Sequence, residues 1–182
     1  QVKARLQQAQ TIYTKYQNLW SQGIGAEIQV INAKADVVVR VTSDCPLNDG
    51  VLIDEVLSQF LNNNFDYFSN VTPPTFPDGL DIEVFSFTAL EKAWKESFSI
   101  KDREHVTPYL RESGKFKTGN FYNSKDESAL RMTVDNQEDF DLISALINQL
   151  GTEKDWIQYV EYLSNHSSLQ QINKNFKRNE GY

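Results

Sequence analysis

Residues 37–47, VVVRVTSDCPL, contain the strongest strand signal of the chain and indicate its fold class. The β-branched first half of this stretch is typical of a strand buried on both faces of a parallel sheet, and a lone carboxylate, Asp44, follows it directly. Apolar residues at helical spacing predict a helix over 51–61, and further strands are predicted over 65–70 and 82–87. Because strands alternate with helices, the sequence predicts an α/β fold with a mostly parallel sheet.

The rest of the chain continues this alternation. Three prolines and a glycine predict an irregular loop over residues 71–81, and Thr88 with Glu91 predicts a capping box for a helix that ends near residue 97. Asn136 is expected to cap the helix that follows it. The remaining predicted elements are a helix over 102–111, a weak strand over 115–122, a strand over 130–134 that ends at Asp135, a helix over 138–150 and a helix that begins at Thr152.

Residues 1–34 form an atypical segment ahead of a domain that we expect to span 35–182 and to end in a helical tail. Apolar residues at spacings of four and three predict an amphipathic helix over 2–20. Residues 26–34 fit a helix or a strand, and we take them as a helix. We expect the apolar stripe of the first helix to be buried against the domain, a partner or a second copy in a homodimer. The stripe consists of Val2, Leu6, Ala9, Tyr13, Tyr16 and Trp20.

Composition excludes several classes of protein. The chain has 182 residues, a formal net charge of -7 and a pI near 4.9. No run of lysine and arginine exceeds two residues, so we expect no nucleic-acid partner. One cysteine is present, and neither a signal-peptide pattern nor an 18-residue apolar stretch occurs, so we expect a cytoplasmic protein with no membrane association.

Two aspartates lie at predicted strand ends. In parallel sheets, ligands bind in the crevice beyond the carboxyl ends of the strands, so Asp44 and Asp135 can face the same crevice. Two carboxylates suit Mg²⁺, which completes its coordination with water and phosphate oxygens. Each aspartate could equally cap the helix that follows it, and spacing alone leaves both interpretations open. Cys45 is interpreted as a small apolar filler, because nothing near it in sequence would lower its pKa.

Two further polar stretches are candidates for binding a substrate. The stretch PDGLDIEVF brings Asp78, Asp81 and Glu83 around a glycine, although Pro-Asp-Gly is also an ordinary turn. The stretch DREHVTPY is dense in groups that could hold a sugar or a carboxylate, and it could equally be a solvated helix face. Its polar residues are Arg103, Glu104, His105 and Thr107. We expect His166 to lie on the surface.

Five ordered stretches together resemble a known family. They are ADVVVRVTSDCPL at 35–47, DYFSNVTPPTFPDGLDIEVFSFTALEKAW at 66–94, DREHVTPYL at 102–110, LRMTVDNQEDFDL at 130–142 and INKNFKRNEGY at 172–182. In order and spacing they resemble the cytidylyltransferase family of the spore coat polysaccharide biosynthesis protein F type. That family is related to the synthetases that make CMP-linked acidic sugars.

The resemblance implies a nucleotide-diphospho-sugar transferase (Rossmann-like) fold. It also implies transfer of a cytidylyl group from CTP to a sugar, with release of pyrophosphate, for cell-surface or spore-coat polysaccharide biosynthesis. By position, Asp44 and Asp135 match the metal-binding aspartates of the related synthetases, so Mg²⁺ is the implied cofactor and these two are the implied catalytic residues. The implied substrate-binding residues, in motifs that resemble the family's sugar-side pocket, are Asp78, Asp81, Glu83, Arg103, Glu104 and His105.

The chain also departs from the family pattern. Family members begin with a strand and a basic loop that holds the triphosphate, and residues 1–34 do not resemble that unit. Pro74 stands where the family has an arginine. The chain opens at Gln1 rather than methionine, so we expect a fragment, a processed product or a natural truncation with low activity as given. Two alternatives stay open: a non-catalytic remnant that binds a sugar or a partner, and a glycosyltransferase of similar fold.

Overall fold

The computed structural model describes residues 36–105 and 107–178 and confirms an α/β fold. The sheet has four strands, ordered β1-β3-β2-β4. β3 is antiparallel to both β1 and β2, and β2 is parallel to β4. The strands are β1 Val37–Arg40, β2 Tyr67–Ser69, β3 Glu83–Ser86 and β4 Thr118–Asn120.

The sheet is mixed, so the prediction of a mostly parallel sheet was wrong in this respect. β1, β2 and β4 share one direction, and β3 runs against them between β1 and β2. The helix α2 (Gly50–Asn63) connects β1 to β2, as expected for a crossover between strands of the same direction. An irregular loop without a helix leads from β2 to β3 and returns the chain in the opposite direction.

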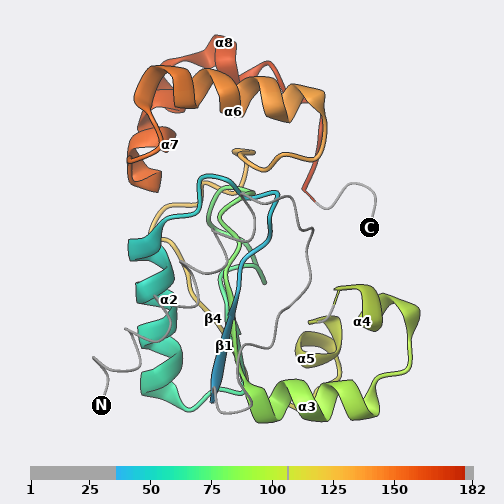
Figure 1. Ribbon diagram of the computed structural model, residues 1–182. Helices are drawn as coiled ribbons and strands as arrows, with labels where there is room; N and C mark the ends of the chain where they lie inside the picture. Colours follow the sequence, from blue (N-terminus) through green and yellow to red (C-terminus); the bar gives the residue numbers. More distant parts are fainter. Residues whose placement is uncertain (1–35, 106, 179–182) are drawn as a thin grey trace.

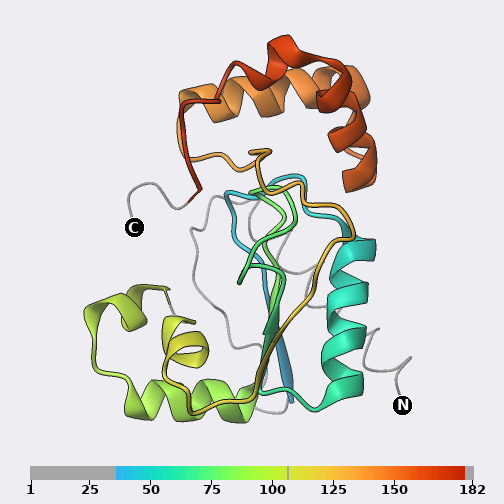
Figure 2. The same ribbon diagram turned by 180° about the vertical axis from the view of Figure 1, so that it is seen from behind.

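Helices cover both faces of the sheet, as Figure 1 and Figure 2 show. Alternate side chains of a strand point to opposite faces, and neighbours in β2 and β3 accordingly belong to different cores. Phe68 and Val84 belong to the core that contains the buried face of α2. Tyr67 and Phe85 belong to a second core, formed with α3 (Phe87–Glu96) and α5 (Pro108–Glu112).

A group of C-terminal helices lies beyond one end of the sheet (Figure 1). It consists of α6 (Gln137–Leu150), α7 (Trp156–Asn165) and α8 (Ser167–Gln170). The buried faces of α6 and α7 join the larger core. Asp49 ties this group to α2, because its carboxylate caps α2 and also accepts a hydrogen bond of 2.9 Å from the backbone of Trp156.

Several predicted element boundaries were wrong. Ser86 caps α3 in place of Thr88, and α7 begins at Trp156 after its cap Asp155, not at Thr152. The single helix predicted over 102–111 is two short helices, α4 (Ile100–His105) and α5, because Pro108 lacks the N–H that a continuous helix needs. Residues 130–134 are no strand and contribute an isolated bridge between Arg131 and Asp78.

Three further expectations concern the burial of β1, the N-terminal residues and membrane-spanning helices. β1 is a half-buried strand at one side of the sheet, not a strand buried on both faces. The segments at 2–20 and 26–34, with the apolar stripe, lie outside the described residues. Within the described ranges, no helix has the length and apolar character needed to cross a membrane.

Candidate active site

Polar residues from all four strands meet at one end of the sheet, where β1, β2 and β4 end, and we call this end the sheet edge. The register pairs Arg40 with Glu83, Ser69 with Glu83, and Ser69 with Asn120. The carboxyl ends of β1, β2 and β4 therefore lie beside the first residue of β3. The C-terminal helices lie beyond this edge (Figure 1), where an α/β sheet usually binds its ligand.

Asp44 and Asp135 lie on two segments that are hydrogen-bonded to each other at this edge. The Asp44 carbonyl accepts 2.8 Å from the backbone N–H of Val134 and 3.1 Å from the hydroxyl of Thr133. Neither aspartate caps a helix, because Asp49 caps α2 and Asn136 caps α6. The capping interpretation of the two aspartates was therefore wrong, and the prediction for Asn136 is confirmed.

Arg131 is the centre of a network that the sequence did not predict. Its guanidinium donates to Asp78 at 2.8 Å, to Asp135 at 2.5 Å and to both oxygens of Asp139 at 2.9 and 2.8 Å. The side chains of Arg131 and Asp139 are 9% and 0% exposed, whereas that of Asp135 is 43% exposed. Arg131 therefore joins two buried carboxylates to one that faces solvent.

The pKa of Asp139 reflects this network. Burial acts to raise the pKa, but hydrogen bonds from Arg131 and Asn173 outweigh it, so the pKa is lowered overall. Asp139 is thus a carboxylate that is ionised in the folded state. A pattern in the sequence could have indicated the network, because Arg131, Asp135 and Asp139 recur at intervals of four residues in the stretch LRMTVDNQEDFDL.

The segment after α8 contacts carboxylates of the same site. The side-chain amide of Asn173 donates to Asp139 at 2.8 Å and to the Arg131 carbonyl at 3.1 Å. Arg178 pairs closely with Asp81 and lies 3.8 Å from Asp78. The structure therefore brings two predicted substrate-binding residues, Asp78 and Asp81, together and pairs both with arginines.

Burial raises the pKa of Asp81 to about 6, although Arg178 acts to lower it. The charges of Asp78, Glu83 and Asp44 raise this pKa further. Burial likewise raises the pKa of Asp78, against the lowering effects of Arg178 and Arg131. The charges that raise these two pKa values come from carboxylates in the stretches at 35–47, 66–94 and 130–142. The carboxylates of these three stretches therefore influence one another electrostatically.

Glu83, the third acidic residue of its motif, lies in a separate buried cluster. Its carboxylate accepts 2.5 Å from the hydroxyl of Tyr67 and pairs closely with Arg40. The guanidinium of Arg111, from α5, lies 3.7 Å away. Three elements of the fold thus bring two arginines and a tyrosine to one carboxylate.

The remaining predicted residues lie on or beside α4. The side chains of Arg103 and Glu104 are outside the described part of the chain. His105 is half-buried at the end of α4, which packs against α5. Thr107 is buried, and its backbone N–H donates to the carbonyl of His105 at 2.7 Å.

Cys45 and His166 occupy the surroundings predicted for them. Burial raises the pKa of Cys45 well above its ordinary value, and Asp44 adds to the effect. A neutral, buried thiol is a poor nucleophile, which agrees with its interpretation as a filler. His166 is exposed at the end of α7, where its ring stacks on Tyr162.

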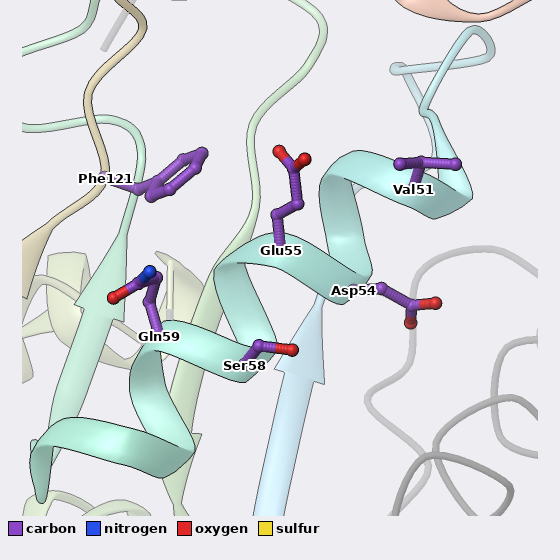
Figure 3. A pocket seen from close by; sticks show the side chains of 6 residues that line it. All are labelled: Val51, Asp54, Glu55, Ser58, Gln59 and Phe121. Carbon is purple, nitrogen blue, oxygen red and sulfur yellow. The ribbon is translucent and has the colours of Figure 1, made fainter.

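A groove of about 460 Å³ lies on the outer side of α2 (Figure 3). It contains none of the residues predicted to bind metal or substrate. Its lining residues are Val51, Asp54, Glu55, Ser58, Gln59 and Phe121. We therefore place the candidate site at the sheet edge rather than in this groove.

The donor atoms at the sheet edge are chemically suitable for Mg²⁺. This cation binds one or two protein carboxylates and keeps waters for the other positions, and the carboxylates of Asp44 and Asp135 fit this preference in type and number. Arg131 occupies one oxygen of Asp135. Among residues 36–105 and 107–178, no three His, Cys, Asp or Glu side chains form a group that could hold a metal by themselves.

One family of known sequences matches most of the chain. The sequence model of that family, described as cytidylyltransferase, matches residues 26–174. The chain therefore belongs to the cytidylyltransferase family.

Relatives and a solved structure agree with this assignment. An uncharacterized protein of Methanocaldococcus jannaschii is 38% identical over 149 residues, which cover 79% of this chain and 59% of that protein. Spore coat polysaccharide biosynthesis protein SpsF of Bacillus subtilis is 28% identical over 138 residues, covering 70% of this chain and 54% of SpsF. A cytidylyltransferase structure from Leptospira borgpetersenii superposes with a TM-score of 0.71 at 33% identity, covering 75% of this chain and 59% of that one. The chain thus spans little more than half the length of each relative.

Proposed function

We propose that the protein takes part in Mg²⁺-dependent transfer of a cytidylyl group from CTP to a sugar, with release of pyrophosphate. Membership of the cytidylyltransferase family supports the reaction class. The name of the Bacillus subtilis relative supports a sugar destined for a polysaccharide. The observation that carries the proposal is the hydrogen bond of 2.8 Å between Val134 and Asp44, because it joins the segments of the two aspartates.

In this proposal Asp44 and Asp135 hold the magnesium ion. The ion would supply positive charge to the phosphate oxygens of CTP and so stabilise the charge that develops on the leaving pyrophosphate. Asp135 is oriented by Arg131, which is itself fixed by two further carboxylates. Asp78 and Asp81 lie at the same edge, where they could accept hydrogen bonds from the hydroxyls of a sugar, whereas the buried carboxylate of Glu83 is already bonded to Tyr67 and Arg40.

The test is CTP binding measured by calorimetry with and without Mg²⁺. Asp44→Asn and Asp135→Asn each remove one negative charge and keep the size of the side chain. Each should weaken Mg²⁺-dependent CTP binding at least about tenfold, since a charge-assisted interaction contributes roughly 1.5–3 kcal/mol. Asp126→Asn is the matched control, because Asp126 is exposed and its side chain accepts from the Ser128 N–H. Unchanged CTP affinity in both test variants would contradict the proposal.

We further propose that turnover by the 182-residue chain is slow. Transfer of a cytidylyl group from CTP needs cationic groups beside the metal to stabilise the charge on the leaving pyrophosphate. Arg131 and Arg178, the arginines near Asp135 and Asp81, are already paired with carboxylates. Pyrophosphate release from CTP with a panel of acidic and amino sugars should therefore stay below about 1 per second, a rate at the low end for enzymes. A faster rate would show that residues other than these arginines stabilise the phosphates.

A further inference from the structure

The groove on the outer side of α2 combines apolar and acidic surface (Figure 3). Val51 is 67% exposed and Phe121 is half-buried, and together they form the apolar part of the lining. Asp54 and Glu55 are exposed residues of the same lining. Exposed apolar surface with a polar rim is typical of a place where another protein segment binds.

The two carboxylates of the groove carry charge that the described residues do not balance. Within residues 36–105 and 107–178, neither Asp54 nor Glu55 takes part in an ion pair. The helix α2 itself contains no lysine or arginine. The groove should therefore attract a segment that carries positive charge.

Residues 1–20 carry the complementary charge. They contain Lys3, Arg5 and Lys15 and no acidic residue, in a chain whose formal net charge is -7. In the amphipathic helix predicted over 2–20, Lys3 and Arg5 would lie on either side of the apolar stripe. The segment would thus present apolar side chains flanked by cations, which is the chemical complement of the groove.

The second half of the apolar stripe is aromatic. It consists of Tyr13, Tyr16 and Trp20, whose rings are apolar but whose hydroxyl and indole N–H groups need hydrogen-bond partners when they are buried. The remaining lining residues of the groove, Ser58 and Gln59, are polar and can supply such partners. The mixed lining therefore suits this stripe better than it would suit an aliphatic one.

The N-terminal segment joins the described chain within reach of the groove. The carbonyl of Asp36 accepts a hydrogen bond of 3.0 Å from the backbone of Phe87, which fixes the chain just ahead of β1. Residues 21–35 can span up to about 50 Å when extended. The helix α2, which shares the larger core with β1, has 14 residues and is about 21 Å long. Residues 2–20 can therefore reach every part of α2 in the same chain.

We propose that residues 2–20 bind as an amphipathic helix in the groove on α2 of the same chain. The apolar stripe packs against Val51 and Phe121, and the basic residues of the segment pair with Asp54 and Glu55. A tethered segment has a higher effective concentration at its own α2 than at that of another copy. The groove contains none of the proposed metal-binding or substrate-binding residues, so the inference does not depend on the proposed function.

The first test is cross-linking of the native 182-residue chain with a carbodiimide, which joins an amine to a carboxylate that it contacts. Mass spectrometry after proteolysis should find Lys3 or Lys15 linked to Asp54 or Glu55. An equal mixture of unlabelled and ¹⁵N-labelled chains distinguishes the two possible arrangements. Links within one chain contain a single isotope, whereas links between labelled and unlabelled peptides would show binding to a second copy and would overturn the proposal.

The second test is hydrogen exchange of the backbone amides of residues 2–20, followed by mass spectrometry. These amides should be protected in the native chain. Asp54→Lys combined with Glu55→Lys should speed their exchange about tenfold or more, because attractions to the basic residues become repulsions. Adding Lys3→Glu and Arg5→Glu to that variant makes the charges opposite again, so part of the protection should return.

Two control variants make the result decisive. Glu161→Lys reverses an exposed charge on α7 and should leave the exchange of residues 2–20 unchanged. Asp54→Asn combined with Glu55→Gln removes both charges without adding any, so its exchange should lie between those of the native chain and the reversed variant. Circular dichroism verifies that each variant is folded, and the neutral variant preserves the test if the reversed one is not.

Three results would each overturn the proposal. The first is the absence of cross-links between the N-terminal lysines and α2. The second is rapid exchange of residues 2–20 in the native chain. The third is protection that stays the same when the charges of Asp54 and Glu55 are removed or reversed, because the segment would then bind elsewhere.

Discussion

Arg131 is the residue whose loss should damage the structure most clearly. Replacing it with methionine keeps an unbranched side chain of similar length but removes the charge. Asp139 would then remain as a carboxylate with a fully buried side chain and no cation, and Asp78 would lose one of its two arginines. Removing one partner of a buried ion pair costs about 3–5 kcal/mol. For a chain of this length, that cost lowers the Tm by about 6–20 °C.

The effect should depend on pH in a defined direction. In the native chain the pKa of Asp139 is lowered, because Arg131 and Asn173 outweigh the raising effect of burial. A lowered pKa stabilises the fold above the pKa of the unfolded state, near 3.9, and this contribution is lost as the pH falls through the folded value. In Arg131→Met burial dominates, so Asp139 takes up a proton more readily. The difference in stability should therefore be largest near pH 7 and shrink towards about pH 4.

Urea denaturation followed by circular dichroism at several pH values measures this difference. Arg131→Met with Asp139→Asn removes both charges and should recover part of the lost stability. Lys115→Met is the control, because Lys115 pairs with Glu96 at the surface and should contribute little. A loss below about 1 kcal/mol for Arg131→Met at pH 7, or a loss that does not change with pH, would refute the assignment of Arg131 as the compensating charge.

Three other predictions concern the loops that support the site. Gly79→Ala should destabilise the fold strongly, because the φ of Gly79 is +104° and an added Cβ would lie 2.4 Å from the Met132 backbone. Gly151→Ala should lower the free energy of unfolding by only about 1 kcal/mol, because the φ of Gly151 is +80° but the space around it is open. Thermal melts of both variants measure this difference. Native Cys45 should resist iodoacetamide at pH 8 and react after urea denaturation, as followed by mass spectrometry, because burial raises its pKa. Asp49→Ala removes the acceptor for two helix N-termini and should cost about 2 kcal/mol in urea denaturation.

The regular elements with strong local signals could be predicted from the sequence. The first four residues of the β-branched run at 37–42 form β1, and the apolar periodicity over 51–61 lies within α2. The direction of β3 could not be predicted, because alternation along a strand is the same for either direction. Only the helix-free loop between β2 and β3 indicated a reversal, and a loop of that length also permits a crossover.

Part of the candidate site could be predicted from the sequence. Asp44 and Asp135 were both predicted to follow strands; residues 130–134 form no strand, but the segments of the two aspartates are hydrogen-bonded to each other at one edge. Their arginine partners were not predictable from spacing, because the ion pair of Arg178 with Asp81 joins residues 97 apart and that of Arg131 with Asp78 joins residues 53 apart. Long-range ion pairs depend on how the C-terminal segment crosses the edge, which no local pattern determines.

The hydrogen bond from Arg131 to Asp135 should make the two proposed metal-binding aspartates differ in their affinity for a cation. The carboxylate of Asp135 is already bonded to Arg131 at 2.5 Å, so a cation that binds it must share it with a guanidinium. The Asp44 carboxylate accepts a weaker contact of 3.6 Å from the thiol of Cys45. A carboxylate that is paired with a guanidinium attracts a cation less strongly than a carboxylate without a positive neighbour. Asp44 should therefore contribute more of the magnesium affinity than Asp135. Asp44→Asn should therefore weaken Mg²⁺-dependent CTP binding more than Asp135→Asn does, and the reverse order in calorimetry would show that Arg131 releases Asp135 when the nucleotide binds.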